Sequence, residues 1–104
     1  VAPKTGPIIN DATVKDLKEA GYEHKIVPSG SYIGISLEEC PEDFLKLFWD
    51  PDYLILAKGM GNFETISEFQ DKLKGRLIYI LRAKCQPVAF NLGARKGELV
   101  ARLV

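Results

Sequence analysis

The sequence predicts an α/β fold in which a mainly parallel sheet is covered by helices on both faces. Short apolar runs, typical of buried strands, alternate along the 104 residues with segments whose apolar residues follow helical spacing. Regular alternation of this kind favours parallel strands joined by right-handed crossovers. The apolar run at 53–57 also ends in a lysine and two glycines, at the place where open α/β sheets bind ligands.

Five strands and four helices are expected, in alternation. The strands are predicted at residues 7–9, 24–27, 53–57, 76–81 and 98–104, and the third is expected to be buried on both faces. The helices are predicted at residues 13–20, 41–49, 62–73 and 87–92. Either Asp11 or Thr13 caps the first helix, and Gly21 ends it. Pro41 opens the second, whose apolar stripe is expected in the core. The result is a Rossmann-like three-layer α/β/α arrangement in a single domain.

Composition excludes several classes of protein. Lys and Arg together number 14, as do Asp and Glu, so the formal net charge is zero. Bulk electrostatics therefore favour neither a nucleic acid nor an anionic membrane as a partner. No apolar run approaches the roughly 20 residues that span a bilayer. Cys40 and Cys85 are expected to be free thiols of a cytoplasmic protein.

The expected carboxyl ends of the strands carry the side chains best suited to chemistry. They hold Asn10, Asp11, Ser29, Gly30, Lys58, Gly59, Arg82 and Lys84. Because the carboxyl ends of parallel strands share one edge, a carboxylate, a hydroxyl and several cations are expected to converge there. Asp11 is the best candidate ligand for a hard cation such as Mg²⁺. Lys58 supplies a point charge suited to phosphate.

Residues 58–62 are expected to hold an anion. Gly59 and Gly61 allow a positive φ and the close approach of a ligand to the backbone, and the amides at the start of the next helix favour negative charge. Structural alternatives stay open at each candidate position. Asp11 and Asn62 can each serve as a helix cap, Ser29 can belong to a simple turn, and the glycines can serve a turn alone. The spacing matches neither the P-loop nor a dinucleotide fingerprint.

Three stretches together resemble the metal-dependent damage-control phosphatases. They are residues 6–13 (GPIINDAT), residues 58–65 (KGMGNFET), and Lys84-Cys85 followed by Pro87-Val88-Ala89. The resemblance covers nearly the whole chain in the right order, and the second stretch is similar to the stand-alone and pantothenate-kinase-fused branches. It implies an enzyme that uses a divalent metal (Mg, Mn, Co or Ni) to hydrolyse phosphate esters of damaged or surplus metabolites, including sugar phosphates.

The resemblance also implies roles for individual residues. Asp11 would bind the metal, with Asn10 beside it as an indirect contact, and Lys58 and Asn62 would hold the substrate phosphate. Asp11 and Lys58 are therefore the expected catalytic residues. Further phosphate contacts are expected from Ser29, Gly59 and Gly61.

One motif of the family does not occur in the 104 residues. It is Asp-Asn-x-Gly-Glu, whose adjacent Asp-Asn pair supplies the other metal ligands. The resemblance therefore implies that the chain is the C-terminal portion of a longer protein, that a helical N-terminal part is its partner, and that the portion alone has little or no activity. The alternative is a non-catalytic phosphate- or nucleotide-binding α/β module. A third reading is a structural subunit that associates through an exposed sheet edge.

Overall fold

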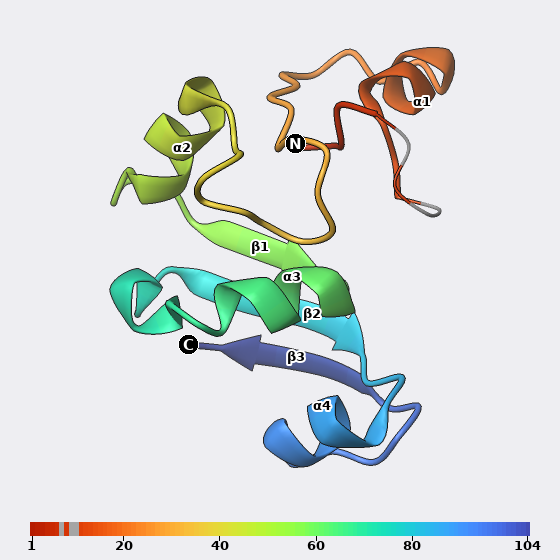
Figure 1. Cartoon of the computed structure of the whole chain (residues 1–104), viewed down its shortest axis with the longest axis vertical. Coiled ribbons are helices and arrows are strands. Elements are labelled where there is room, and N and C mark those ends of the chain that lie inside the picture. The colour runs from red at the N-terminus through yellow and green to blue at the C-terminus, as the bar shows by residue number, and fades with distance from the viewer. Residues whose placement is uncertain (7, 9–10) are drawn as a thin grey trace. The chain divides into compact units, whose positions relative to one another are not determined.

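The computed structural model describes residues 1–6, 8 and 11–104. The chain divides into two compact units, Val1–Trp49 and Asp50–Val104 (Figure 1). Among the described residues, no helix is long and apolar enough to cross a membrane.

The strand expected at residues 7–9 falls, apart from Ile8, outside the described residues, and Ile8 itself is not in a strand.

The first unit contains the helices α1 (Val14–Glu19) and α2 (Glu42–Trp49). Thr13 caps α1: its hydroxyl accepts from the Asp16 amide, while the Asp16 carboxylate accepts from the Thr13 amide. This reciprocal pair is a capping box, and it decides between the two expected caps in favour of Thr13. On α2, Phe44 and Phe48 are buried and stacked with ring centroids 5.4 Å apart, whereas Trp49 is 37% exposed. The stripe expected in the core is therefore buried only in part.

Residues 24–27 do not form the expected strand. The neighbouring backbone is nevertheless extended and paired with the start of the chain, since the Val27 amide donates to the Val1 carbonyl and the Ser29 amide to the Pro3 carbonyl, both at 2.9 Å. Pro3 lies within the paired segment and has no N–H to donate to the segment that contains Val27 and Ser29. The pairing therefore stays interrupted, and no regular strand is formed.

The second unit is built on a three-stranded sheet in the order β1 (Ile55–Lys58), β2 (Leu77–Arg82) and β3 (Leu99–Leu103). β1 is parallel to β2, whereas β2 is antiparallel to β3 (Figure 1). The connections contain α3 (Met60–Ile66), the 3-10 helix η1 (Gln70–Leu73) and α4 (Gln86–Asn91). The single helix expected at 62–73 is thus two shorter helices with a break at residues 67–69.

The sheet is mixed, and the expectation of a mainly parallel sheet is wrong because α4 is too short. Its six residues span about 9 Å, whereas β2 is about 20 Å long, so α4 cannot carry the chain back along the strand. The Ala83 amide donates to the Glu98 carbonyl at 2.9 Å and the Gly97 amide donates to the Ala83 carbonyl at 2.7 Å. β3 therefore begins where β2 ends and runs in the opposite direction.

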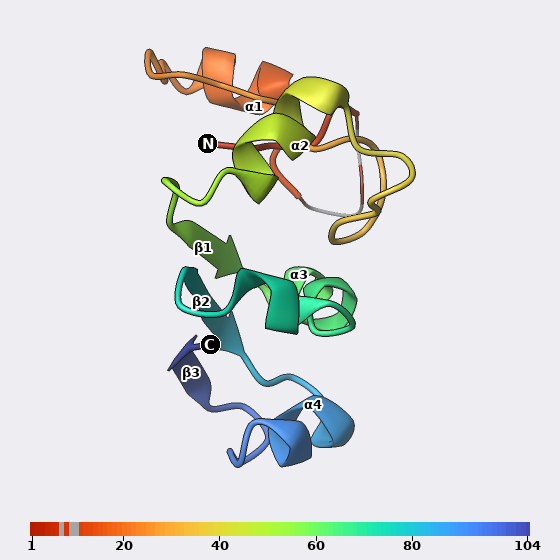
Figure 2. The same cartoon turned by 90° about the vertical axis from the view of Figure 1, so that its left-hand side faces the viewer.

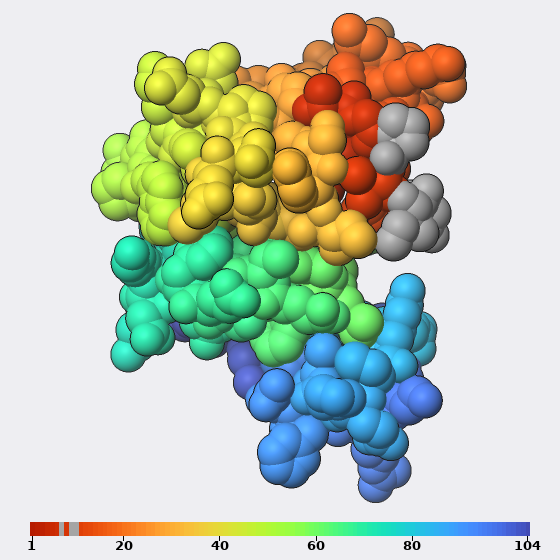
Figure 3. All heavy atoms as spheres, viewed as in Figure 1, coloured from red at the N-terminus to blue at the C-terminus, as the bar shows by residue number. Residues whose placement is uncertain are grey.

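Helices cover one face of this sheet (Figure 2). Leu77, Tyr79 and Leu81 of β2 are buried, and Tyr79 contacts Phe63 of α3 and Gln70 of η1. Atoms of α3, η1 and α4 cover the sheet in the space-filling view (Figure 3). Side chains alternate along a strand, so Ile78 and Ile80 point to the other face. Leu56 of β1 is 60% exposed, which corrects the expectation that this strand is buried on both faces. The unit has two layers, a sheet and one layer of helices.

Candidate functional site

The turn at residues 58–62 lies at the carboxyl end of β1. Gly59 follows Lys58 with φ 97° and ψ 159°, a backbone conformation that is essentially restricted to glycine. Its amide donates to the Ile80 carbonyl at 2.9 Å, which extends the pairing of β1 with β2 by one residue. The Asn62 side-chain amide donates to the Lys58 carbonyl at 2.7 Å. The first contact fixes the turn to β2, and the second joins its first residue to its last.

Two candidate residues of this turn, Asn62 and Gly61, have backbone positions that differ from those considered from the sequence. Asn62 is not the N-cap of α3, because Gly59 occupies that position without a side-chain hydrogen bond. Gly61 lies inside α3 and has no positive φ. Lys58 itself is exposed and belongs to neither of the ion pairs found among the described residues.

The stretch at residues 84–85 meets the 58–62 turn. The Lys84 amide contacts the Met60 sulfur at 3.2 Å, and Cys85 is the N-cap of α4. Arg82 is engaged elsewhere, since its guanidinium donates to the Gly97 carbonyl at 2.6 Å. Two stretches that are far apart in sequence and that resemble the phosphatase family are thus brought together, with the exposed cation of Lys58 beside them.

Ser29 is turned into the first unit rather than toward a ligand. Its side chain is buried, its hydroxyl donates to the Pro3 carbonyl at 3.3 Å, and its carbonyl accepts from the Cys40 thiol at 3.2 Å. Gly30 has φ 103°, and a Cβ at this position would lie 3.5 Å from the Glu39 carbonyl oxygen. These contacts support a structural part for this segment within the unit.

Asp11 is exposed, and its amide donates to the Ile8 carbonyl at 2.8 Å. Its carboxylate does not cap α1. Near it lies a residue that sequence reasoning missed: Lys4 is buried and its ammonium donates to the Gly34 carbonyl. Burial lowers the pKa of Lys4, while the charges of Asp11 and Cys40 act in the opposite direction. No pattern in the sequence marks this lysine, since lysines are almost always exposed.

The expected convergence of these side chains remains a prediction. Asp11 and Ser29 belong to the first unit, whereas Lys58, Gly59 and Asn62 belong to the second. Asn10 lies outside the described residues.

Comparison with known proteins identifies the family. Residues 1–100 match the damage-control phosphatase ARMT1-like domain. The chain belongs to this family. It is 48% identical over 103 residues to a damage-control phosphatase of Pyrococcus horikoshii, covering 96% of this chain and 34% of that protein. It is 37% identical over 102 residues to a damage-control phosphatase of Archaeoglobus fulgidus, with coverages of 94% and 34%.

Two further proteins match over nearly the whole of this chain. An uncharacterized protein of Methanocaldococcus jannaschii is 51% identical over 100 residues, which are 93% of this chain and 33% of that protein. The crystal structure of a DUF89 family protein from Pyrococcus horikoshii superposes with a TM-score of 0.84 at 46% identity, over 95% of this chain and 34% of that chain. This chain thus spans about a third of the length of the relatives it matches.

The described residues of this chain do not by themselves form a metal site. In residues 1–6, 8 and 11–104, no three His, Cys, Asp or Glu side chains are grouped to hold an ion. Asp11 is a single exposed carboxylate, and a divalent cation in a protein needs several oxygen ligands. The divalent metal implied by the resemblance does not fit these residues alone.

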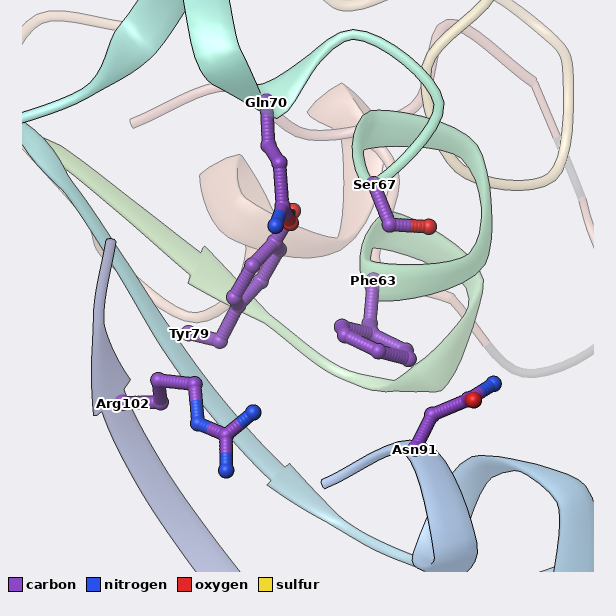
Figure 4. Close-up of a pocket in the computed structure, with 6 residues that line it drawn as sticks. All are labelled: Phe63, Ser67, Gln70, Tyr79, Asn91 and Arg102. Atoms are coloured by element: carbon purple, nitrogen blue, oxygen red, sulfur yellow. Dashed lines mark hydrogen bonds between the residues drawn. The ribbon is translucent and has the colours of Figure 1, made fainter.

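A hollow of about 200 Å³ lies on the helix-covered face of the sheet (Figure 4). It is lined by Phe63, Ser67, Gln70, Tyr79, Asn91 and Arg102. The Tyr79 hydroxyl donates to the Gln70 side-chain oxygen at 3.0 Å, and the Arg102 guanidinium donates to the Leu92 carbonyl at 2.6 Å. These polar groups already have partners within the unit, and none of the predicted site residues lines the hollow.

Proposed function

We propose that this chain carries the phosphate-contacting part of a phosphatase that hydrolyses phosphate esters of small metabolites. The observation that supports it is the 58–62 turn, where an exposed lysine and a glycine-only backbone conformation follow a strand in a chain of this family. Two relatives that match this chain are named damage-control phosphatases. The substrate class we propose is that implied by the resemblance: phosphate esters of damaged or surplus metabolites, including sugar phosphates.

The residues of the turn have distinct parts in this reaction. A water oxygen bonds to phosphorus while the ester P–O bond breaks, and the leaving alcohol takes up the proton. Negative charge is carried by the phosphoryl oxygens as this happens, and the Lys58 ammonium stabilises it. Asn62 positions Lys58 through the 2.7 Å hydrogen bond to its carbonyl. Gly59 lets the backbone approach the phosphate without a side chain in the way.

Asp11 is proposed as the one metal ligand from the described residues. The other ligands would come from the part of the relatives that lies beyond the aligned third, together with a helical layer that would complete a three-layer fold. No step of the proposed reaction is assigned to the metal.

The test compares two lysines in a protein of full length. A chimera in which this chain replaces the aligned third of the Pyrococcus horikoshii relative is assayed for phosphate release from a panel of sugar phosphates. Lys58→Ala should lower kcat/KM by about two orders of magnitude or more, as loss of a group that stabilises transition-state charge does. Lys74→Ala, an exposed lysine of the same unit outside the turn, is the control and should leave the rate unchanged.

Two outcomes would contradict the proposal. Wild-type kcat/KM in the Lys58→Ala chimera would remove Lys58 from the site. Binding of a sugar phosphate by the chimera without release of phosphate would favour the non-catalytic binding module.

A further inference from the structure

Basic side chains gather at one edge of the sheet in the unit Asp50–Val104. The carboxyl ends of β1 and β2 and the start of β3 lie at this edge (Figure 1). The segments 58–62, 82–84 and 95–98 meet there, and they hold five basic side chains but a single acidic one, that of Glu98. We call the five the basic rim: Lys58, Arg82, Lys84, Arg95 and Lys96. All five belong to one compact unit, so their arrangement follows from contacts within that unit alone.

The turn at residues 95–98 is fixed to the end of β2. The Glu98 amide donates to the Arg95 carbonyl at 3.0 Å, which closes the turn, and Gly97 has φ 94°. The Gly97 amide donates to the Ala83 carbonyl at 2.7 Å, and the Gly97 carbonyl accepts from the Arg82 guanidinium at 2.6 Å. The basic side chains of this turn therefore start from a backbone that is anchored to the same strand end as the rest of the rim.

The positive charge of the rim has little compensation within the unit. The Arg95 Nε lies 3.9 Å from the Glu98 carboxylate, and the two side chains are 93% and 50% exposed, so this ion pair is weak. Lys58, Lys84 and Lys96 are exposed and belong to neither of the ion pairs found among the described residues. A group of like charges raises the local concentration of ligands of opposite charge. The rim therefore favours a ligand with more than one anionic group.

We infer that the substrate of the proposed phosphatase carries a second anionic group, which Arg95 and Lys96 bind while Lys58 contacts the phosphate that is hydrolysed. This step rests on the proposed function, because it takes the 58–62 turn as the contact for that phosphate. Arg95 can bind a phosphate or carboxylate through two parallel N–H groups, and Lys96 adds a point charge beside it. The two residues would thus determine substrate specificity and take no part in the bond that breaks.

The spacing along the rim suits two anionic groups at opposite ends of one small molecule. Lys58 is level with Ile80 of β2, whereas the 95–98 turn is level with Ala83, three residues further along and one strand further across. Strands lie about 4.8 Å apart and rise about 3.3 Å per residue, so the two backbone positions are about 14 Å apart. Lysine and arginine side chains are long enough to close part of this distance. The second anionic group is therefore expected across the carbon skeleton from the first, as in a sugar bisphosphate.

The test compares a sugar bisphosphate with a monophosphate in the chimera with the Pyrococcus horikoshii relative. Calorimetric titration gives the Kd of glucose 1,6-bisphosphate and of glucose 6-phosphate, and phosphate release from each is measured in parallel. Two double variants of the chimera are titrated in the same way. Arg95→Gln with Lys96→Gln removes the proposed contacts, and loss of the weak Arg95–Glu98 pair should leave the fold intact. Lys72→Gln with Lys74→Gln removes the same charge from exposed positions of the unit that precede β2.

The chimera should bind the bisphosphate about tenfold more tightly than the monophosphate, since a second phosphate adds hydrogen bonds to charged groups. The Arg95 and Lys96 double variant should reduce this preference to about twofold, the factor expected from having two equivalent phosphates. The Lys72 and Lys74 double variant should keep the full preference.

Three outcomes would overturn the inference: no preference in the chimera, the same preference in both double variants, or binding of neither sugar phosphate. A preference that depends on Arg95 and Lys96 in a chimera that releases no phosphate would leave the second anion contact standing and reject the proposed activity. Phosphate release without any preference would do the reverse.

Discussion

The hydroxyl of Tyr79 is buried beneath the helices of the sheet unit, where it donates to the Gln70 side chain at 3.0 Å. Burial raises its pKa from 10 to about 12. The folded state therefore favours the neutral phenol, and this contribution to stability is complete below pH 10 and is lost as the pH rises toward 12.

Tyr79→Phe should lower the free energy of unfolding at neutral pH by about 1 kcal/mol, the usual net value of one hydrogen bond. It should also remove the tyrosine ionisation step near pH 12 from an ultraviolet absorbance titration. Urea unfolding at neutral pH measures the first effect. Identical alkaline titrations of the variant and the wild-type chain would contradict the assignment of that step to Tyr79.

Thr13 makes a contribution to stability that a single substitution can measure. Its amide and its hydroxyl both hydrogen-bond the Asp16 carboxylate, and these bonds lower the pKa of Asp16 from its ordinary 3.8. The folded pKa is depressed, so the contribution is present above pH 3.8 and is lost as the pH falls below it. Thr13→Ala should cost about 1 kcal/mol of stability at pH 7 by removal of the cap.

The difference in urea midpoint between Thr13→Ala and the wild-type chain should narrow below pH 3.8, where protonation of Asp16 weakens the same pair. Thr5→Ala, an exposed threonine of the same unit, is the control and should be neutral. A difference in urea midpoint that stays constant down to low pH would show that the Asp16 carboxylate does not contribute to the cap.

The structural role of a single residue can be predicted from sequence where interactions with its immediate neighbours determine that role. Thr13, one of the two expected caps, does cap α1, and Pro41 directly precedes α2, which begins one residue later than expected. Capping and a fixed φ act within a few residues of the chain. Ser29 and Lys4 could not be placed in this way. Their burial depends on Pro3, Gly34 and Cys40, which are distant in sequence or separated by turns whose course the local pattern does not determine.

The connection from β1 to α3 is the element on which the candidate site depends. Gly59 adopts φ 97° and ψ 159°, and a Cβ there would have no heavy atom within 4 Å. Gly59→Ala therefore meets no clash, and its cost of about 1–3 kcal/mol comes from the backbone conformation alone. Relief of this strain would change the conformation of the 58–62 turn. Because the turn is the proposed phosphate contact, we also expect phosphate release by the chimera to fall.

Gly6→Ala is the control for this substitution, because Gly6 also has open space but no positive φ. Thermal unfolding and the phosphate-release assay should both separate the two variants. Equal unfolding temperatures would show that the 58–62 turn tolerates a side chain and would weaken its assignment as a close backbone contact for phosphate.

The element order was largely predictable, whereas the direction of β3 was not. Apolar runs and helical spacing predicted β1, β2 and α2 close to their observed bounds, because these signals depend on local burial. Pro87 and Gly93 predicted α4 within one residue of its bounds. The direction of β3 depends on the length of α4 relative to β2 and on the pairing of Gly97 and Glu98 with Ala83. Both features are relations between different elements, and the hydrophobic periodicity within one element carries no information about them.

For the molecule as a whole, the family could be predicted from motifs, but the residues that the structure describes do not include a complete metal site. The motif at residues 6–13 and that at residues 58–65 carry the resemblance, and residues 1–100 match the family. The chain covers only about a third of each matched relative, and the prediction of a single domain stays a prediction beside two compact units. The resemblance assigns the other metal ligands to a motif that does not occur in these 104 residues, so no pattern in them could predict where those ligands lie.

The last prediction concerns Asp11 and the metal. The 104-residue chain alone should bind Mn²⁺ weakly, because its described residues offer no group of three ligands. The chimera should bind it more tightly, and Asp11→Asn should weaken that binding by about tenfold or more, since one anionic oxygen ligand is lost.

Asp43→Asn, an exposed aspartate of the same unit in the first turn of α2, is the control and should leave the affinity unchanged. Calorimetric titration of the chain, the chimera and both variants measures these differences. Equal Mn²⁺ affinity of the Asp11→Asn and wild-type chimeras would place the metal elsewhere. The 58–62 turn would then be the only part of the proposed site that this chain supplies.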